Sequence, residues 1–416
     1  MSGGQVAYLL FRFPNLTETF VAEEIRHVQQ MGIKVRLFSL LRPRKELVHP
    51  VSAELLPLVR YAPELYSPSI WWAQLYFLLK TPRKYLSALG VLLGEPAPSF
   101  SMVIRRLVIF LKAVWITRQL EHSSVQLVHT HFAWLSAAAC MVVHHLLGLP
   151  FTATAHAFDI YSPRNDLLGL TARSAHRLVT ISEYNKQTIL DLLAKTNGTM
   201  AAPIEVIHCG IDLSSFRPSG QKAVSSTFEI VSVGSLVEKK GHEYLIQACA
   251  LLNARGLDFR CTIVGGGNRK PSLEALTREL CLEDRIRLVG TQSQSWVRDK
   301  LGQSDMFALA CVVAGAGERD GIPVAMMEAL AMELPVVSTP VSGIPELIRH
   351  EHTGLLVPER DADALAGAIA RLIADEGLRR RLARNGRALI QWEYDISLTA
   401  RQLVELFRRA NQECGR

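Results

Sequence analysis

The sequence predicts an α/β fold with two doubly wound parallel sheets. Short apolar segments alternate with longer segments of helical period, and this alternation stops and restarts near the middle of the chain. The strand-like segments of the first half are Val6–Phe11, Lys34–Phe38, Val125–His129, Phe151–Ala155, Arg177–Ile181 and Ile204–His208, with helical segments at Thr17–Met31, Trp134–Leu147 and Glu183–Leu193. Such alternation is typical of a parallel sheet covered by helices on both faces.

The second half repeats the pattern after a break at 209–227, which contains Gly210, Pro218, Gly220 and several serines and is typical of a linker. The later strand-like segments are Glu229–Val233, Arg260–Val264, Arg285–Val289, Met306–Leu309, Val336–Ser338 and Leu355–Val357, followed by helical pattern from 361 to 411. We expect an N-terminal Rossmann-like domain (1–212), a linker (213–227), a C-terminal Rossmann-like domain (228–394) and a C-terminal helix (395–416) that packs toward the N-terminal domain. Ligands of such sheets bind beyond the carboxyl ends of the strands, here in a cleft between the domains.

Length and composition exclude several classes of protein. The 416 residues exceed one compact core, and 49% hydrophobic with 20% charged residues describe a globular chain. The seven cysteines never form a C-x-x-C pair, which argues against a disulfide framework or a zinc-cysteine site and fits a reducing compartment. Residues 1–10 show no secretory signal. We therefore expect a cytoplasmic protein.

One segment concentrates basic and aromatic residues. Between Trp71 and Glu121 there are seven basic residues and two acidic ones, together with eight aromatic residues, and no apolar run reaches the roughly 18 residues of a spanning helix. The basic residues are Lys80, Arg83, Lys84, Arg105, Arg106, Lys112 and Arg118. Two interpretations stay open: core helices with solvated basic faces, or helices that lie on an anionic membrane surface. The second would place the protein at the inner face of the membrane.

The most informative motif is Asp320-Gly-Ile-Pro-Val-Ala-Met-Met-Glu328. Pro323 suits the first turn of a helix, which places Asp320 on the preceding loop and Glu328 inside the helix. Two such carboxylates can accept hydrogen bonds from vicinal sugar hydroxyls, and the backbone N–H groups at the helix start can bind phosphate. Alternatively, Asp320 is only a loop acid and Glu328 a solvated helix residue.

Two glycine-containing loops precede this motif. In Gly234-Ser-Leu-Val-Glu-Lys-Lys-Gly241, either Lys239 or Lys240 is placed at a strand-to-helix turn to neutralise a diphosphate. The triple glycine of Val264-Gly-Gly-Gly267 predicts a flexible turn after the next strand, and is weak evidence by itself.

Together with Pro335–Glu346 and His352–Val357, these blocks resemble those of glycosyltransferase family 4, whose members share the two-domain GT-B fold. The resemblance implies that Glu328 holds the ribose and that Lys240 contacts the diphosphate. Asp320 would contact the transferred sugar, although the family usually has Glu there. Members often have Arg at the position of Ser235, so Arg298, Arg319 or Arg269 could replace that cation, or the donor site is altered. The implied donor-binding residues are Gly234, Ser235, Gly290, Gly321, Ile322, Pro323 and Glu328, with His156, Asp320 and Lys240 as catalytic residues.

The N-terminal half contributes a second set of candidates. Phe13-Pro-Asn-Leu-Thr-Glu-Thr-Phe20 resembles the Pro-x-x-Ser-Glu-Thr-Phe block of exopolysaccharide members, which implies that Thr17, Glu18 and Thr19 touch acceptor or donor. Asn15 or Thr17 could instead simply cap the following helix.

Histidines cluster where two predicted strands end, at His129, His131 and His156. The resemblance assigns His156 to the transferred sugar, and we place His131 on the acceptor side. A metal site would need three well-placed ligands, which the spacing does not fix, and we expect no metal. Asp361-Ala-Asp363 opens a helix, where acids favour the helix dipole, so we interpret it as a cap.

These features predict a retaining, metal-independent glycosyltransferase without a cofactor. It would move a hexose from a UDP- or GDP-linked donor to a glycan or lipid-linked acceptor in cell-surface polysaccharide synthesis. A nucleotide-sugar epimerase of GT-B fold and a non-catalytic carbohydrate-binding relative stay open. A dehydrogenase is disfavoured because the first loop has no glycine, and nucleic-acid binding because no basic stripe accompanies a known module.

Overall fold

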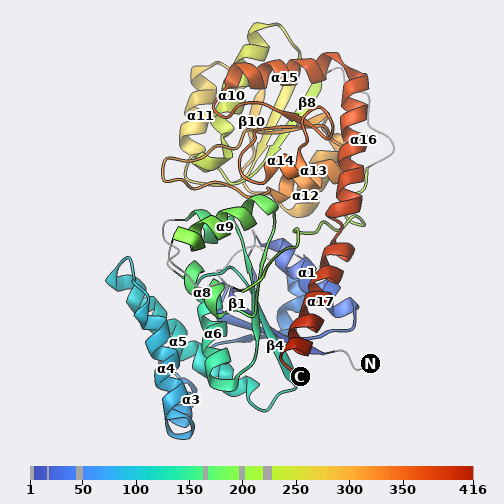
Figure 1. Ribbon diagram of the computed structural model, residues 1–416. Coiled ribbons are helices and arrows are strands. Elements are labelled where there is room, and N and C mark those ends of the chain that lie inside the picture. The colour runs from blue at the N-terminus through green and yellow to red at the C-terminus, as the bar shows by residue number, and fades with distance from the viewer. Residues whose placement is uncertain are drawn as a thin grey trace. The chain divides into compact units, whose positions relative to one another are not determined.

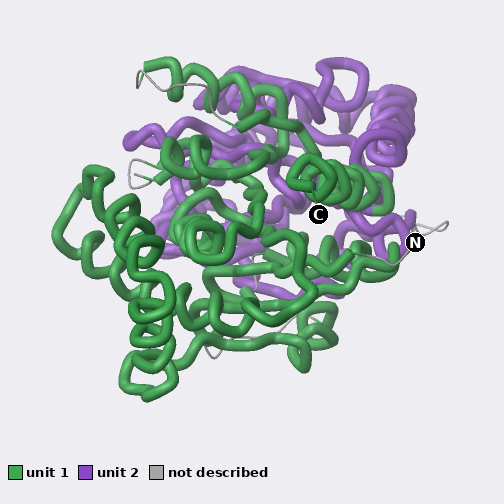
Figure 2. The backbone as a smooth tube through the Cα atoms, turned by 60° about the horizontal axis from the view of Figure 1, so that its bottom comes forward, with its two compact units in different colours: residues 1–208, 397–416 green, residues 209–396 purple. Residues whose placement is uncertain are grey.

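The computed structural model describes residues 4–15, 18–43, 50–162, 167–195, 202–218 and 227–415. The chain divides into two compact units: unit 1 comprises residues 1–208 and 397–416, and unit 2 comprises residues 209–396 (Figure 2). Ile211 forms a bridge with Asp395, and Phe216 is buried in the core of unit 2. The start of the expected linker therefore belongs to unit 2, and its residues 219–226 lie outside the described ranges.

Unit 1 contains a seven-stranded parallel sheet in the order β3-β2-β1-β4-β5-β6-β7 (Figure 1). The strands are β1 (Gln5–Arg12), β2 (Lys34–Leu41), β3 (Val59–Tyr61), β4 (Val125–His131), β5 (Phe151–Ala155), β6 (Arg177–Thr180) and β7 (Ile204–Val206). The chain reverses its direction of strand addition between β1 and β4, which is the switch point where doubly wound sheets bind ligands. The sequence predicted every strand of this sheet except β3.

The helices of unit 1 connect these strands and cover both faces of the sheet. They are α1 (Thr19–Gln30), α2 (Pro50–Leu55), α3 (Pro68–Lys80), α4 (Pro82–Gly94), α5 (Phe100–Leu120), α6 (Leu135–Leu147), α7 (Ala157–Tyr161), α8 (Leu168–Ser174), α9 (Glu183–Lys195) and α17 (Ile396–Glu413). Three of them, α3, α4 and α5, follow one another between β3 and β4 and lie together at the side of unit 1 (Figure 1).

Unit 2 contains a six-stranded parallel sheet in the order β10-β9-β8-β11-β12-β13. Its strands are β8 (Phe228–Val233), β9 (Phe259–Val264), β10 (Ile286–Leu288), β11 (Met306–Leu309), β12 (Val336–Ser338) and β13 (Leu355–Leu356). Its helices are α10 (His242–Ala254), α11 (Lys270–Glu279), α12 (Gln294–Gln303), α13 (Val324–Ala331), α14 (Ile344–Leu347), α15 (Ala362–Ala374) and α16 (Glu376–Glu393). Asp361 caps α15 by accepting a hydrogen bond from the Ala364 N–H at 2.8 Å, which confirms its interpretation as a cap.

Both sheets are buried on two faces. In β11, Phe307 and Leu309 pack into one apolar cluster, whereas Met306 and Ala308 pack into another. Because successive side chains of a strand point to opposite faces, each strand needs apolar residues throughout its length. This requirement explains why uninterrupted apolar segments marked the strands in the sequence.

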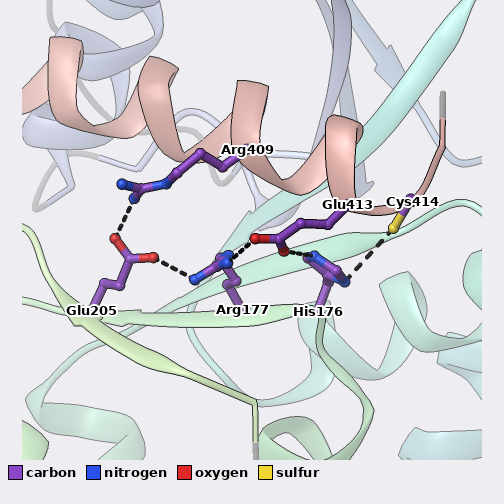
Figure 3. Close-up of polar contacts among 6 residues, drawn as sticks. All are labelled: His176, Arg177, Glu205, Arg409, Glu413 and Cys414. Atoms are coloured by element: carbon purple, nitrogen blue, oxygen red, sulfur yellow. Dashed lines mark hydrogen bonds and ion pairs between the residues drawn. The ribbon is translucent and has the colours of Figure 1, made fainter.

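The C-terminal helix α17 completes unit 1. Its Phe407 packs against Tyr8 of β1 with ring centroids 6.3 Å apart. Figure 3 shows the polar contacts at its end: Arg177 pairs with both Glu205 and Glu413, and Arg409 also pairs with Glu205. The last helix therefore belongs to the first sheet, although about 190 residues of unit 2 separate it from β7.

Two of the seven basic residues between Trp71 and Glu121 are not solvated. Arg106 is 1% exposed and donates to the backbone oxygens of Leu92, Glu95 and Pro96, at 3.1, 2.6 and 3.0 Å. Lys112, also 1% exposed, donates to the Leu40 carbonyl at 3.0 Å. These two cations hold helices together, so the expectation of basic faces in solvent is wrong for them. Within the described ranges, none of the helices has both the length and the apolar character that crossing a bilayer requires.

Candidate functional site

In unit 2, the loop after β8 turns sharply and returns beneath the end of β11. Its last glycine, Gly241, has φ +61°, and a Cβ there would lie 1.7 Å from the Ala310 carbonyl oxygen. Only glycine fits this close backbone approach. The Val312 N–H donates to the Lys239 carbonyl at 3.0 Å on the same side of the turn. The turn thereby fixes Lys239 and Lys240 near the carboxyl ends of the strands.

The triple-glycine loop packs against this turn. A Cβ on Gly265 would lie 1.9 Å from the Gly234 carbonyl oxygen, and one on Gly267 would lie 2.3 Å from that of Leu236. The Leu236 N–H also donates to the Gly266 carbonyl at 2.9 Å. The glycines therefore allow two backbones to stack closely, and the expectation of a merely flexible turn is wrong. Gly290, with φ +72°, joins the same arrangement because its carbonyl accepts the Gly265 N–H at 2.9 Å.

Asp320 and two lysines form a mostly buried ion cluster in this region. Lys240 Nζ lies 2.5 Å from Asp320 Oδ2, and Lys239 Nζ lies 3.4 Å from Asp320 Oδ1. Burial alone would raise the pKa of Asp320, but the charges of Lys240 and Lys239 outweigh it and lower that pKa. Burial alone would lower the pKa of Lys240, but the charge of Asp320 and the hydrogen bond to it outweigh burial and raise that pKa. The cluster therefore carries two positive charges and one negative charge at neutral pH.

The second cation at Asp320 is Lys239. Arg269 pairs with Glu243 at 2.6 Å, and Arg298 lies 3.5 Å from its neighbour Asp299. Arg319 donates to the Gly317 carbonyl at 3.3 Å. Ser235 lies at the start of the turn with an exposed side chain. The sequence named Lys239 and Lys240 as alternatives, whereas the structure brings both to one carboxylate.

Glu328 lies on α13 and is only 8% exposed. Burial raises its pKa to about 7, although a hydrogen bond with the Gln294 side chain opposes the shift. It is therefore not a solvated helix residue. Pro323 is the residue before the first helical turn, not within it, because α13 begins at Val324. Gly321, Ile322 and Pro323 are buried on the segment that joins Asp320 to this helix.

Two further residues contact this ion cluster and were missed in the sequence. His242 is 2% exposed, and burial followed by the charge of Lys240 lowers its pKa to about 4. Cys311 Sγ lies 3.9 Å from Asp320 Oδ2, and burial raises the pKa of its thiol to about 12. The position of His242 directly after Gly241 could have indicated it, whereas nothing near Cys311 in the sequence does.

In unit 1, a chain of hydrogen bonds connects the ends of β4 and β5 to α1. The Tyr8 hydroxyl donates to Glu24 Oε1 at 2.9 Å, and the same oxygen lies 3.0 Å from His131 Nε2. His131 Nδ1 lies 3.1 Å from His156 Nε2. The rings of His131 and His156 stack with centroids 5.4 Å apart. The structure thus brings together His131 and His156, which the sequence indicated, and adds Tyr8 and Glu24, which the sequence did not indicate.

Burial keeps His129 and His156 uncharged at neutral pH. Burial, followed by the charge of His131, lowers the pKa of His156 to about 3, and the same causes hold the pKa of His129 well below its usual range. His129 Nδ1 lies 2.8 Å from Thr152 Oγ1, a hydroxyl that can form a hydrogen bond with a neutral imidazole ring. The backbone N–H of His156 donates to Asp159 Oδ2 at 2.8 Å, and burial raises the pKa of Asp159 to about 7.

The block at the start of α1 contributes one acid to the same region. Burial raises the pKa of Glu18 to about 7, while the Asn15 side chain, which donates to Glu18 Oε1 at 2.7 Å, and His131 oppose the shift. Glu18 precedes the first turn of α1 and Thr19 begins it, and the Glu18 side chain makes no capping hydrogen bond. Thr17 lies outside the described residues.

One metal-sized group of ligand atoms exists among the described residues: Glu24, His129 and His131 offer atoms within 4.8 Å of one another. Its carboxylate comes from α1, so the cluster differs from the histidine-only set considered from the sequence. Glu24 already accepts from Tyr8 and contacts His131, as given above. His129 makes its hydrogen bonds elsewhere, with Thr152 Oγ1 at 2.8 Å and Thr154 Oγ1 at 3.5 Å.

Two family models match adjacent parts of the chain. Residues 17–215 match Glycosyltransferase Family 4, and residues 218–389 match Glycosyl transferases group 1. The amylovoran biosynthesis glycosyltransferase AmsK of Erwinia amylovora is 39% identical over 212 residues, covering 51% of this chain and 52% of the relative. WcaL of Escherichia coli, assigned provisionally to colanic acid biosynthesis, is 37% identical over 226 residues, covering 53% and 55%. The chain thus spans about half the length of these curated relatives.

The solved structure of Anabaena Alr3699/HepE in complex with UDP-glucose superposes with a TM-score of 0.72 at 16% identity, covering 97% of this chain and 99% of that one. Together with the two parallel sheets, this likeness defines the GT-B class of fold. The two family matches leave only two residues between them, so residues 17–389 consist almost entirely of a Glycosyltransferase Family 4 region followed by a Glycosyl transferases group 1 region.

Proposed function

We propose that this chain is a retaining, metal-independent glycosyltransferase that moves a hexose from a UDP- or GDP-linked donor to a glycan or lipid-linked acceptor. The observation that carries the proposal is the ion cluster of Lys239, Lys240 and Asp320 beside the α13 helix that bears Glu328. A net positive, mostly buried cluster at the carboxyl ends of a parallel sheet is suited to a diphosphate.

The donor has a partner for each of its polar parts. The two lysines would neutralise the diphosphate, and the buried carboxylate of Glu328 would accept from the ribose hydroxyls. Asp320, released from Lys240 as the phosphate takes over that ammonium, would accept from a hydroxyl of the transferred sugar. The UDP-glucose bound by Anabaena HepE supports a donor of this class for the shared fold.

In the proposed step the anomeric C–O bond breaks and its electron pair stays on the diphosphate. The acceptor oxygen forms the new bond on the same face of the sugar and gives its proton to the departing phosphate. The lysine charges stabilise the leaving group, which is the largest electrostatic demand of the reaction. His156, held by His131, would contact the sugar. Since no step needs an ion, we expect transfer to continue in EDTA.

The pathway proposed is the synthesis of a cell-surface polysaccharide from the cytoplasmic side of a membrane. The names of AmsK and WcaL, which concern amylovoran and colanic acid, support this context. They give no support to an epimerase or to a non-catalytic relative.

The test has two stages. UDP- and GDP-sugars are first compared by thermal shift, because a ligand that binds only the folded state raises stability by mass action. The donor that binds is then assayed for transfer and hydrolysis with wild type and Glu328→Ala. Turnover that Glu328→Ala abolishes supports the proposal. Release of a free sugar isomer, or tight donor binding without turnover in the presence of membranes carrying lipid-linked glycans, would overturn it.

A further inference from the structure

We propose that α3, α4 and α5 form a docking surface for an anionic membrane. Ten large hydrophobic side chains of these helices are exposed, out of seventeen in the described part of the chain. They are Trp71, Trp72, Leu75, Leu78, Leu79, Leu86, Leu93, Phe100, Ile104 and Leu107, and we call them the apolar arm surface. A soluble monomer rarely concentrates so many large apolar residues in one place without a partner.

The helix α3 presents apolar side chains on both its buried and its exposed face. Its buried stripe of Ile70, Ala73, Gln74 and Phe77 has the spacing of a helix face packed on a core. The opposite face should then be polar, but it presents Trp72 at 69% and Leu79 at 74% exposure. An apolar face opposite a packed face needs a second apolar environment.

The arm is a built structure and not a loose segment. The Arg106 guanidinium joins α5 to the end of α4 through three backbone oxygens, as described above. Lys112 ties α5 to the end of β2 and lies 3.6 Å from Glu64. The Gln74 side chain of α3 donates to the Leu111 carbonyl of α5 at 3.0 Å, so that all three helices are held together while the apolar arm surface stays outside. The exposure therefore follows from how the helices are fixed.

The charges around this surface select its partner. Arg83, Lys84 and Arg105 are exposed, and none of them makes an ion pair within the described ranges. The single acid between 68 and 120, Glu95, pairs with Arg173 at 2.5 Å. Exposed tryptophans, leucines and unpaired cations are the composition that binds the interface of an anionic bilayer.

A second copy of the chain fits this surface less well. A two-fold dimer brings the same patch of both copies together, so the patch must complement itself. Here Arg83, Lys84 and Arg105 would face the same cations of the partner copy, and the single acid of residues 68–120, Glu95, is already paired with Arg173. Anionic lipid headgroups supply the missing negative charge.

Docking would bring the transferase proposed above to a lipid-linked acceptor, and in that sense the inference rests on the proposed function. Its test contains neither donor nor acceptor, however, so the two can fail separately. Purified full-length protein is mixed with phosphatidylcholine vesicles that contain either no anionic lipid or about 30% phosphatidylglycerol, which supplies the anionic headgroups. Bound protein is measured by flotation.

We expect binding to the anionic vesicles, at least about ten-fold weaker binding to the neutral ones, and release by high salt. Trp72→Glu with Leu79→Glu should reduce vesicle binding at least ten-fold, and Arg83→Glu with Lys84→Glu should remove the preference for anionic lipid. The matched controls are Trp392→Glu, at a tryptophan of unit 2 that is 80% exposed, and Arg255→Glu with Arg287→Glu, at exposed arginines of unit 2. They should leave binding unchanged.

Circular dichroism and thermal melting establish that each variant is folded. Because the substituted side chains are exposed, we expect these changes to leave the fold intact. Equal binding to both kinds of vesicle, or loss of binding in the controls as large as in the arm variants, would overturn the proposal. So would a concentration-dependent dimer that the Trp72→Glu and Leu79→Glu changes dissociate, because the surface would then belong to a second copy.

Discussion

Both units carry ionisable side chains where their parallel strands end, but the two groups differ in charge. In unit 2, Lys239, Lys240 and Asp320 are all ionised and pair with one another. In unit 1, burial keeps His129 and His156 neutral. The two sheets have the same kind of topology, so the difference comes from the side chains and not from the fold.

The physical reason is the cost of burying charge. A buried charge persists only where an opposite charge repays its lost hydration, and Asp320 does this for the two lysines. Burial raises the pKa values of Glu18 and Asp159 to about 7, so that part of unit 1 disfavours negative charge. A charged site favours a charged ligand and a neutral one favours hydroxyls. Under the proposed function, the diphosphate would therefore bind in unit 2 and sugar hydroxyls would contact unit 1.

The largest expected effect comes from removing the central cation. Lys240→Ala should lower kcat/KM for sugar transfer by roughly 10²–10³, the usual loss when one group that stabilises a developing negative charge is removed. Lys239→Ala should cost less, because its Nζ lies farther from Asp320 and its side chain is 26% exposed against 13%. Steady-state transfer kinetics measure both effects.

The matched control is Lys270→Ala, which removes an exposed lysine of unit 2 that lies 3.6 Å from Glu274. Its kinetics should equal those of the wild type. If Lys240→Ala also keeps full activity, the charged cluster of unit 2 is structural and the assignment of the diphosphate fails.

A second prediction concerns the stability of unit 2. The pKa of Glu328 is raised from its ordinary 4.5 to about 7, so the folded chain favours its protonated form. Ionising it costs stability: the cost is absent below about pH 4.5, grows as the pH rises and is complete above about pH 7. Glu328→Gln should therefore stabilise the protein at pH 8 by up to about 3 kcal/mol, from the energy equivalent of the shift.

Thermal or urea unfolding at pH 8 and pH 4.5 measures this difference, which should vanish at the lower pH. The same variant should lose donor binding. Wild-type donor affinity should fall several-fold from pH 8 to pH 6, as the carboxylate that accepts from the ribose is protonated. A pH-independent affinity would show that Glu328 does not bind the donor as a carboxylate.

The strands were predictable because burial on both faces leaves an apolar segment for each one. The strand β3 was missed because it has only three residues and includes Arg60, so it offers no apolar run. Arg106 and Lys112 show the converse: a single basic residue within an apolar helix looks solvated in sequence, and only the carbonyls that approach it in space reveal that it is buried.

The candidate site was predictable where neighbours in sequence are neighbours in space. Asp320 and Glu328 share one loop and helix, and Lys239 and Lys240 share one turn. Glu24 could not be found in this way, because it meets His131 across 107 residues. Cys311 likewise reaches Asp320 only through the return of the chain after β11. Contacts of this kind depend on sheet topology, which local patterns do not encode.

A smaller effect is expected from unit 1. Glu24→Gln removes the carboxylate that accepts from Tyr8 and contacts His131, so the rings of His131 and His156 lose a fixed orientation. Transfer should slow on the order of ten-fold, below the roughly 10²-fold loss of a full 1 Å misplacement. Binding of the nucleoside diphosphate should not change, since unit 2 supplies its charges.

The matched control is Glu23→Gln on the same helix, whose carboxylate pairs with Arg26 at 2.7 Å. It should leave the rate of transfer unchanged. Weaker binding of the diphosphate in Glu24→Gln would contradict the division of labour between a neutral unit 1 and a charged unit 2.

The smallest effect, and the most direct measure of the comparison, is the response to salt. Screening weakens attraction between a diphosphate and the lysines, but it weakens partly buried contacts less than exposed ones. Raising ionic strength about ten-fold should therefore lower the affinity for UDP or GDP only a few-fold. The affinity for uridine or guanosine, which lack the diphosphate, should stay constant. Titration calorimetry of each pair at two salt concentrations measures the difference. Since Lys240→Ala removes the partner of the diphosphate, it should also reduce the salt response, and an unaltered response would place the anion elsewhere than at Lys240.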